Sequence, residues 1–201
     1  MRRTRNQSGV KYGTKVNAMN CPVCKSENLT PLELEANLSS LNCSKCGGNW
    51  VPGFTYWTWL EQHGPNLPER TESPEERPAT DNPEMKTCPE CRSLMFQYRV
   101  GHGLGFSLDQ CPGCKGIWFD RNEWETLKSR NLHDDVHAIF TAPWQAAASR
   151  EERKRWLEQM YASKLGADDY AQVKEFRTWL DSHPRKQELL AFLIDRDPFD
   201  V

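Results

Sequence analysis

Eight cysteines, arranged as four Cys-x-x-Cys pairs, constrain this chain of 201 residues more than any other feature. Such a turn directs two thiolates at one point, and two turns complete the tetrahedron of soft ligands that zinc prefers. Residues 25–42 separate the two pairs of the first set and residues 92–110 those of the second, and both gaps suit a four-cysteine zinc site. We therefore predict two Zn²⁺ ions, one per site. The predicted ligands are Cys21, Cys24, Cys43 and Cys46 for the first ion and Cys88, Cys91, Cys111 and Cys114 for the second.

Other uses of cysteine compete with this interpretation. Disulfides would suit a secreted chain, but the first twenty residues are basic and lack the apolar core of an export signal. A thioredoxin-like site would be one Cys-x-x-Cys beside a βαβ pattern, whereas four occur here in two matched sets. Iron–sulfur ligation also uses four cysteines and is the main alternative to zinc.

The two sets of cysteines belong to an internal repeat. Each pair of the first set has its counterpart in the second set at a nearly constant offset along the chain. Gly48 and Trp50 recur as Gly116 and Trp118. A unit of about 40 residues buries too little core to fold alone, so each copy should depend on its metal. We expect a small, metal-dependent α+β fold with two zinc ribbons, each a short antiparallel β-hairpin followed by a helix, and a C-terminal α-helical region.

The second copy carries the clearer pattern. Apolar and polar residues alternate over 94–99 and again around Phe106 and Leu108, which predicts two strands joined by a glycine-rich turn at 101–105. We expect Gly116 to supply a backbone conformation that other residues avoid.

Support for this ribbon is expected from three further side chains. Trp118 should pack against the hairpin as part of the core. Asp120 and Glu123 have the spacing of a capping box, which predicts a helix that begins at Asp120.

The first copy is looser. Pro52 stands where the second copy has Asp120, so the predicted helix, which ends at His63, lacks this cap. Five large apolar residues crowd the segment. We interpret them as core in preference to an exposed interaction surface. They are Phe54, Tyr56, Trp57, Trp59 and Leu60.

The second copy resembles a known family. Its Cys-Pro-x-Cys, followed by Cys-Pro-x-Cys-x-Gly-x-Trp-x-Asp and Glu123, is similar to the transcription-factor-IIB-type zinc ribbon found in many small bacterial proteins. The resemblance is tight over 88–128 and looser over 21–63. Asn122 and Trp124 depart from the common pattern, which has Gly and Leu there. The resemblance implies zinc and the ribbon fold, but it indicates little about function because one fold serves many.

The remaining segments differ in composition. Residues 1–18 carry five bases and no acid, which predicts a flexible basic arm; a start at Met19 is the alternative. Residues 64–86 are proline-rich and acidic, which predicts an extended, solvated linker that tethers the two ribbons and allows freedom between them. The predicted domains are therefore the arm (1–18), ribbon 1 (19–63), the linker (64–86), ribbon 2 (87–130) and a C-terminal helical region (131–201).

The C-terminal region shows helical periodicity. A short helix should follow Asp134, and three longer amphipathic helices should carry the apolar stripes Trp156–Leu165, Tyr170–Leu180 and Leu189–Ile194. These stripes should be buried either in a small bundle or against ribbon 2. The segment from 130 on has 11 bases and 13 acids, so no basic face is expected.

Three histidines in ribbon 2 and the C-terminal region are weaker candidates for chemistry. His133 and His137 are four residues apart, as metal ligands on a helix would be, but no accompanying glutamate motif occurs. We expect them to pack or to lie on the surface, and we expect His102 to be a turn residue.

The sequence argues against several functions. Four cysteines leave no open metal position for a substrate, and neither a phosphate-binding loop nor a nucleophile motif occurs, so we expect no enzyme. No apolar stretch is long enough to span a membrane. The formal charge of −2 becomes about −6 when each zinc–tetrathiolate centre adds −2, which disfavours nucleic acid outside the basic arm.

We therefore predict a cytoplasmic, non-catalytic zinc protein that acts as an adapter or scaffold for another protein. The alternative is a nucleic-acid-binding or transcription-associated protein that uses the arm. The oligomeric state cannot be derived from the sequence.

Overall fold

The computed structural model describes residues 19–25, 28–63, 78–196 and 198. The predicted basic arm and residues 64–77 of the linker lie outside this part of the chain. The described residues form two compact units that divide between Gln145 and Ala146, and each is considered by itself.

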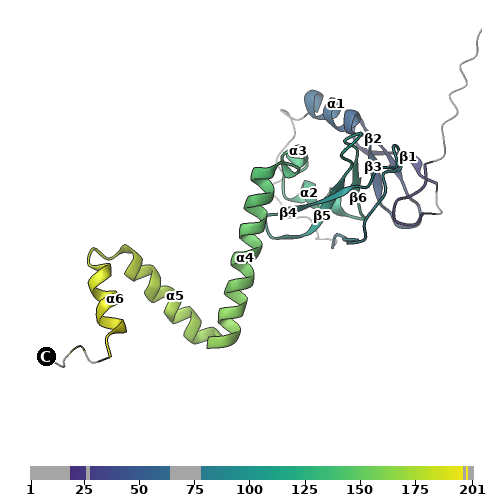
Figure 1. Cartoon of the computed structure of the whole chain (residues 1–201). Helices are drawn as coiled ribbons and strands as arrows, with labels where there is room; N and C mark the ends of the chain where they lie inside the picture. Colours follow the sequence, from purple (N-terminus) through teal and green to yellow (C-terminus); the bar gives the residue numbers. More distant parts are fainter. Residues whose placement is uncertain (1–18, 26–27, 64–77, 197, 199–201) are drawn as a thin grey trace, which may run out of the picture. The chain divides into compact units, whose positions relative to one another are not determined.

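The first unit contains two ribbons with the same order of elements (Figure 1). Each has a hairpin, a third strand of three residues and a helix, so the predicted α+β fold is confirmed. Ribbon 1 comprises β1 (Thr30–Glu35), β2 (Leu38–Asn42), β3 (Asn49–Val51) and α1 (Gly53–His63). Ribbon 2 comprises β4 (Phe96–Gly101), β5 (Leu104–Gln110), β6 (Ile117–Phe119) and α2 (Glu123–Ser129).

The two ribbons share one sheet of six strands, in the order β1-β2-β3-β6-β5-β4. The third strands pair antiparallel at its centre, with Trp50 opposite Trp118. All three residues of each central strand are buried. The prediction of freely moving ribbons is therefore wrong: both central strands carry apolar side chains on both faces, and only pairing buries them and satisfies their backbone.

The linker also packs in part. Lys86 is buried, and the Thr80 backbone N–H donates to the Arg121 carbonyl at 3.0 Å. Most side chains of 78–86 are nevertheless exposed, so the expectation that 64–86 stays solvated is wrong chiefly for Lys86, whose ammonium group finds carboxylate partners on ribbon 2.

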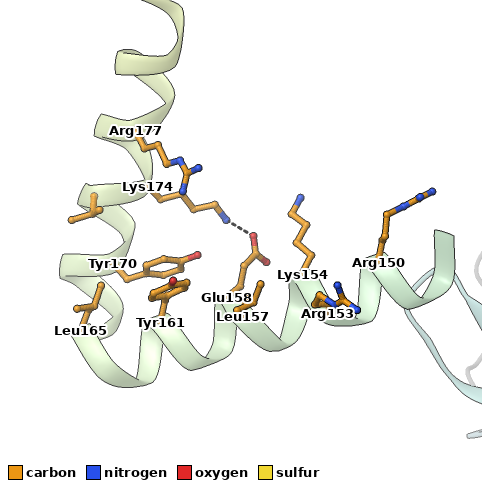
Figure 2. Close-up of a pocket in the computed structure, with 11 residues that line it drawn as sticks. Arg150, Arg153, Lys154, Leu157, Glu158, Tyr161, Leu165, Tyr170, Lys174 and Arg177 are labelled. Atoms are coloured by element: carbon orange, nitrogen blue, oxygen red, sulfur yellow. Dashed lines mark hydrogen bonds and ion pairs between the residues drawn. The ribbon is translucent and has the colours of Figure 1, made fainter. Parts of the chain in front are cut away.

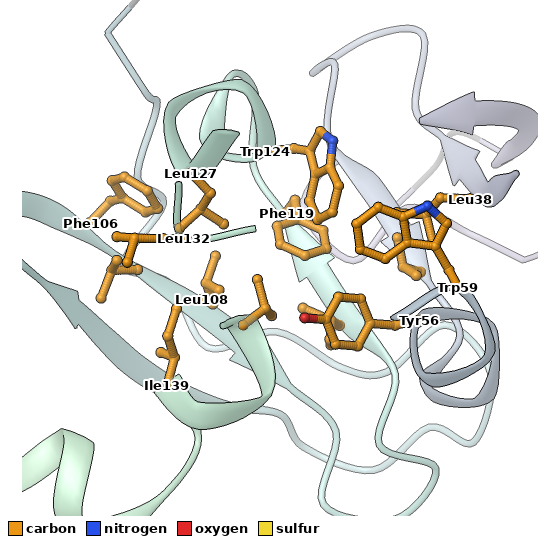
Figure 3. Packing of buried hydrophobic residues seen from close by; sticks show 14 residues of the cluster. Leu38, Tyr56, Trp59, Phe106, Leu108, Phe119, Trp124, Leu127, Leu132 and Ile139 are labelled. Carbon is orange, nitrogen blue, oxygen red and sulfur yellow. The ribbon is translucent and has the colours of Figure 1, made fainter. Parts of the chain in front are cut away.

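One face of the sheet carries the main hydrophobic core (Figure 3). Helices α1 and α2 and the short helix α3 (Val136–Ile139) contribute to this core. Trp59 of ribbon 1 and Trp124 of ribbon 2 meet there edge to face, with ring centroids 5.7 Å apart. Lys128 of α2 also forms an ion pair with Glu35 of β1, so contacts between the ribbons extend beyond the strands.

The aromatic residues of α1 divide between core and surface. Tyr56 and Trp59 are buried, and the Tyr56 hydroxyl donates to the carbonyls of His133 and Asp134, each at 3.1 Å. Phe54 and Trp57 are 82% and 47% exposed. The prediction of core is therefore right for two aromatic residues and wrong for two, because a helix on a sheet buries only one face.

The second unit contains the remainder of α4 (Ala142–Leu165), with α5 (Ala167–Ser182) and α6 (Lys186–Ile194). The three longer helices are confirmed, but the prediction that their apolar stripes are buried is wrong. Among the described residues of this unit, only Ala148 and Leu180 are buried apolar side chains. None of the helices that the structure describes is both long and apolar enough to cross a membrane.

Candidate metal centres

The structure gathers the eight cysteines into the two predicted groups of four. In ribbon 1, the Sγ atoms of Cys21 and Cys46 are 3.6 Å apart, and those of Cys24 and Cys43 are 3.9 Å apart. A tetrahedron with Zn–S bonds of about 2.3 Å places its sulfurs about 3.8 Å apart. The first site therefore matches a zinc tetrathiolate.

The second site has similar geometry. The Sγ atoms of Cys88 and Cys114 are 3.5 Å apart, and those of Cys91 and Cys111 are 3.3 Å apart. All eight cysteines are free, and these separations are far longer than a disulfide bond of about 2.05 Å. Cys91 is the exposed cysteine of the second site, and hydrogen bonds with Ser93 lower the pKa of its thiol to about 6.

Each Cys-x-x-Cys turn closes in the same way. The backbone N–H of the residue after its second cysteine donates to the carbonyl of its first cysteine, at 2.8 to 3.1 Å. That residue always has a positive φ, between 61° and 77°. The four residues are Lys25, Gly47, Arg92 and Lys115. Three of the four are basic, so three of the turns carry a positively charged residue directly after their second cysteine.

Gly116 therefore does not supply the unusual backbone conformation, which belongs to Lys115. It is glycine for a different reason: a Cβ there would lie 2.1 Å from the ring of Trp50. In return, a Cβ on Gly48 would lie 2.2 Å from the ring of Trp118. The tryptophan of each ribbon thus covers the glycine of the other ribbon. Each glycine lies two residues after the second cysteine pair of its own ribbon. We call these reciprocal contacts the Trp–Gly interlock.

A second apolar cluster joins the two metal sites around the interlock. Trp50 and Trp118 are both buried in it, together with cysteines of both sites. The two sites are therefore connected through packed side chains and not only through the backbone.

Asp120 supports Trp118 instead of capping a helix. Its carboxylate accepts hydrogen bonds from Trp118 Nε1 at 2.7 Å and from the backbone N–H of Asn82 at 3.0 Å. Helix α2 begins at Glu123, after Asn122 at its N-cap, which has a φ of 66°. The predicted cap is wrong, although half of the capping box forms: the Asp120 N–H donates to Glu123 Oε2 at 2.7 Å.

Ribbon 1 lacks this polar support. Pro52 occupies the position that corresponds to Asp120, and a proline offers no carboxylate. The buried Nε1 of Trp50 finds no hydrogen-bond partner among the described residues.

A buried charged cluster surrounds Asp120 in ribbon 2. Lys86 Nζ lies 2.7 Å from the carboxylate of Asp109 and 3.4 Å from that of Asp120. Burial raises the pKa of Asp109 to about 6, although the ion pair with Lys86 opposes this shift. Burial, and then repulsion from Asp120, raises the pKa of Glu123 well above its ordinary value. No motif in the sequence marks Lys86 or Asp109 as members of this cluster.

Asp81 also lies close, and one carboxylate oxygen each from Asp81, Asp120 and Glu123 fits within 4.8 Å. The ammonium group of Lys86 offsets part of this negative charge without a metal. The raised pKa of Glu123 reduces the charge further, because it favours the neutral carboxyl group.

The histidines pack against aromatic rings. His133 is buried between Trp59 and Trp124, at 6.2 and 6.1 Å between ring centroids. His137 lies 5.2 Å from Trp57. Within the described part of the chain, neither histidine joins a group of residues that could hold a metal. His102 lies in the β4–β5 turn with a φ of 52°, as expected.

Comparison with known proteins identifies one segment. Residues 87–130 match the family model of the transcription factor zinc-finger, a zinc ribbon of transcription-factor-IIB type. The match covers ribbon 2 and its four cysteines. Neither a curated protein nor a solved structure matches the chain. The zinc-ribbon match and the two tetrahedral sulfur sites are consistent with two Zn²⁺ ions, one per ribbon.

Proposed function

We propose that this chain is a non-catalytic zinc protein that binds another protein through its C-terminal helices. The observation that supports this proposal most strongly is the exposure of apolar side chains in the second unit. Trp156 is 60% exposed and Ile194 is 81% exposed. Seven more large apolar residues of this unit are also exposed: Tyr161, Leu165, Val173, Phe176, Trp179, Phe192 and Leu193.

Such exposure is typical of a surface that a partner covers. Isolated apolar residues on a surface are ordinary, but nine of them within three consecutive helices are too many to be incidental. Aromatic residues contribute strongly at protein interfaces, and this unit offers both tryptophans and phenylalanines.

The metal sites support a structural role for zinc. All four tetrahedral positions of each site are filled by sulfur, so neither leaves a position for substrate or water. We propose a reducing compartment, such as the cytoplasm, because all eight thiols must stay reduced to bind metal.

Affinity purification of the zinc-loaded full chain tests this proposal. A nuclease-treated native extract should yield a protein in stoichiometric amount with the wild type. The Trp179→Ser/Ile194→Ser variant should lose it, whereas the matched control Phe54→Ser, which changes an exposed residue of α1, should keep it.

Two outcomes would contradict the proposal. One is salt-sensitive recovery of nucleic acid in place of protein, above all if a chain that starts at Met19 fails to recover it. The other is loss of the partner from Phe54→Ser alone, which would move the interface to α1.

A further inference from the structure

The second unit contains a groove of about 620 Å³ between α4 and α5 (Figure 2). Its floor is apolar. Tyr161 and Tyr170 stack where the two helices meet, with ring centroids 6.1 Å apart and planes 15° from parallel. Leu157, Leu165 and Val173 complete the floor.

The apolar floor is open to solvent. Tyr161, Leu165 and Val173 are all exposed, and they come from both helices. Leu157, Tyr161 and Leu165 recur at every fourth position and therefore form one stripe along α4. Two helices with facing apolar stripes are ordinarily completed by a third helix, as in a helical bundle.

The rim of the groove is strongly basic. Five bases line it, and Glu158 is the one acid among its lining residues. Glu158 already forms an ion pair with Lys174 at 2.9 Å. The bases are Arg150, Arg153, Lys154, Lys174 and Arg177. Arg177 also pairs with Asp181 at 3.9 Å, outside the groove lining. The expectation that the C-terminal region has no basic face is thus wrong, because the neighbouring acids Glu151, Glu152 and Glu175 do not line the groove.

We propose that this groove binds an acidic amphipathic helix from a partner protein. Apolar side chains of that helix would cover the floor, and its acidic residues would face the basic rim, which favours association and excludes basic partners. This inference rests on the proposed function and specifies the chemistry of the partner.

The floor favours a peptide over nucleic acid. Nucleic-acid grooves combine positive charge with aromatic faces on which bases stack. Here most of the floor is aliphatic, and Tyr161 and Tyr170 stack on each other. An apolar side chain therefore fits this surface better than a base does.

Fluorescence anisotropy with the zinc-loaded full chain tests the proposal. The probe is a labelled helical peptide with leucines at i, i+3 and i+7 and glutamates elsewhere, and its twin has lysine in place of every glutamate. The acidic peptide should bind about tenfold tighter or more, and salt should weaken it. Arg150→Glu/Lys154→Glu should weaken it by about tenfold. The control Lys164→Glu/Arg196→Glu changes charge equally at exposed positions outside the groove and should bind like the wild type.

Several results would overturn the proposal. Equal binding of the two peptides, or an equal loss in the control variant, would show that the groove does not select acidic helices. Tighter binding of a single-stranded oligonucleotide, lost in Arg150→Glu/Lys154→Glu, would assign the groove to nucleic acid. A dimer of the wild type that only this variant dissociates would assign it to a second copy.

The outcome also separates this inference from the proposed function. If the acidic peptide does not bind, while Trp179→Ser/Ile194→Ser still loses a partner recovered by the wild type, the groove proposal fails and the proposed function stands.

Discussion

The two ribbons build the same metal site with different support. Both close their cysteine turns with a left-handed residue, and both place a tryptophan on the other's glycine. Ribbon 2 then anchors its tryptophan to Asp120 within a buried ionic cluster. Ribbon 1 has Pro52 instead, leaves the Trp50 N–H without a partner among the described residues, and packs aromatic residues of an eleven-residue helix against the sheet.

This difference shows what a zinc ribbon requires. The cysteine turns occur in both copies because the metal needs four sulfur ligands at one point. The interlocking glycines occur in both because any larger side chain would overlap a tryptophan ring. The support behind the tryptophan varies, since apolar packing and buried hydrogen bonds are alternative ways to fix a side chain.

Removal of a metal ligand should have the largest effect. Cys43→Ser and Cys111→Ser should each reduce two bound zinc ions to one, because a structural zinc contributes about 10–16 kcal/mol to folding. The remaining zinc should also be released to a chelator faster than from the wild type, since the interlock joins the sites. Metal content per chain and release kinetics measure both effects. Release of the remaining zinc at the wild-type rate would show that the ribbons are independent.

Filling the interlock should cost less. Gly48→Ala and Gly116→Ala should each destabilise the chain by about 1–3 kcal/mol, because the new methyl group would overlap a tryptophan ring of the other ribbon. Denaturant unfolding measures the loss. Gly105→Ala is the matched control, since a Cβ there meets nothing within 4 Å. A neutral result at either interlock glycine would mean that the tryptophan above it can move aside.

Replacing each interlock tryptophan by phenylalanine should affect the two ribbons differently. Trp118→Phe removes a hydrogen bond and leaves Asp120 without that donor, whereas Trp50→Phe removes an N–H that has no partner among the described residues. Trp118→Phe should therefore cost about 1–3 kcal/mol more than Trp50→Phe, measured by denaturant unfolding. Equal losses would mean that the polar support of ribbon 2 adds no stability.

The smallest expected effect depends on pH. The pKa of Glu123 is raised in the folded state. Above its ordinary pKa, Glu123 therefore loses its proton more readily in the unfolded chain than in the folded one, and this difference costs stability that Glu123→Gln avoids. The variant should gain stability relative to the wild type as pH rises from 4.5, by at most about 1.4 kcal/mol per pH unit, and the gain should level off above the folded pKa. Paired unfolding curves at several pH values measure the difference. A constant difference would indicate that Glu123 titrates normally.

The sequence predicts local chemistry here better than distant contacts. All eight cysteines are predictable because each ligand pair is encoded within a single short turn. Gly116 is also identified correctly but for the wrong reason, since its partner Trp50 lies in the other ribbon. Lys86 and Asp109 have no local signature, because a buried ion pair depends on tertiary packing. Helical periodicity predicts α4 to α6, but it cannot reveal that their apolar faces stay uncovered.

The central strand pair also has a consequence during synthesis. The ribosome synthesises residues 52–116 after β3 and before β6. During that interval, β3 of the growing chain lacks the strand with which it pairs in the folded protein. An unpaired strand edge invites pairing with other chains. At three residues, β3 exposes a short edge, which limits this hazard until the second ribbon leaves the ribosome.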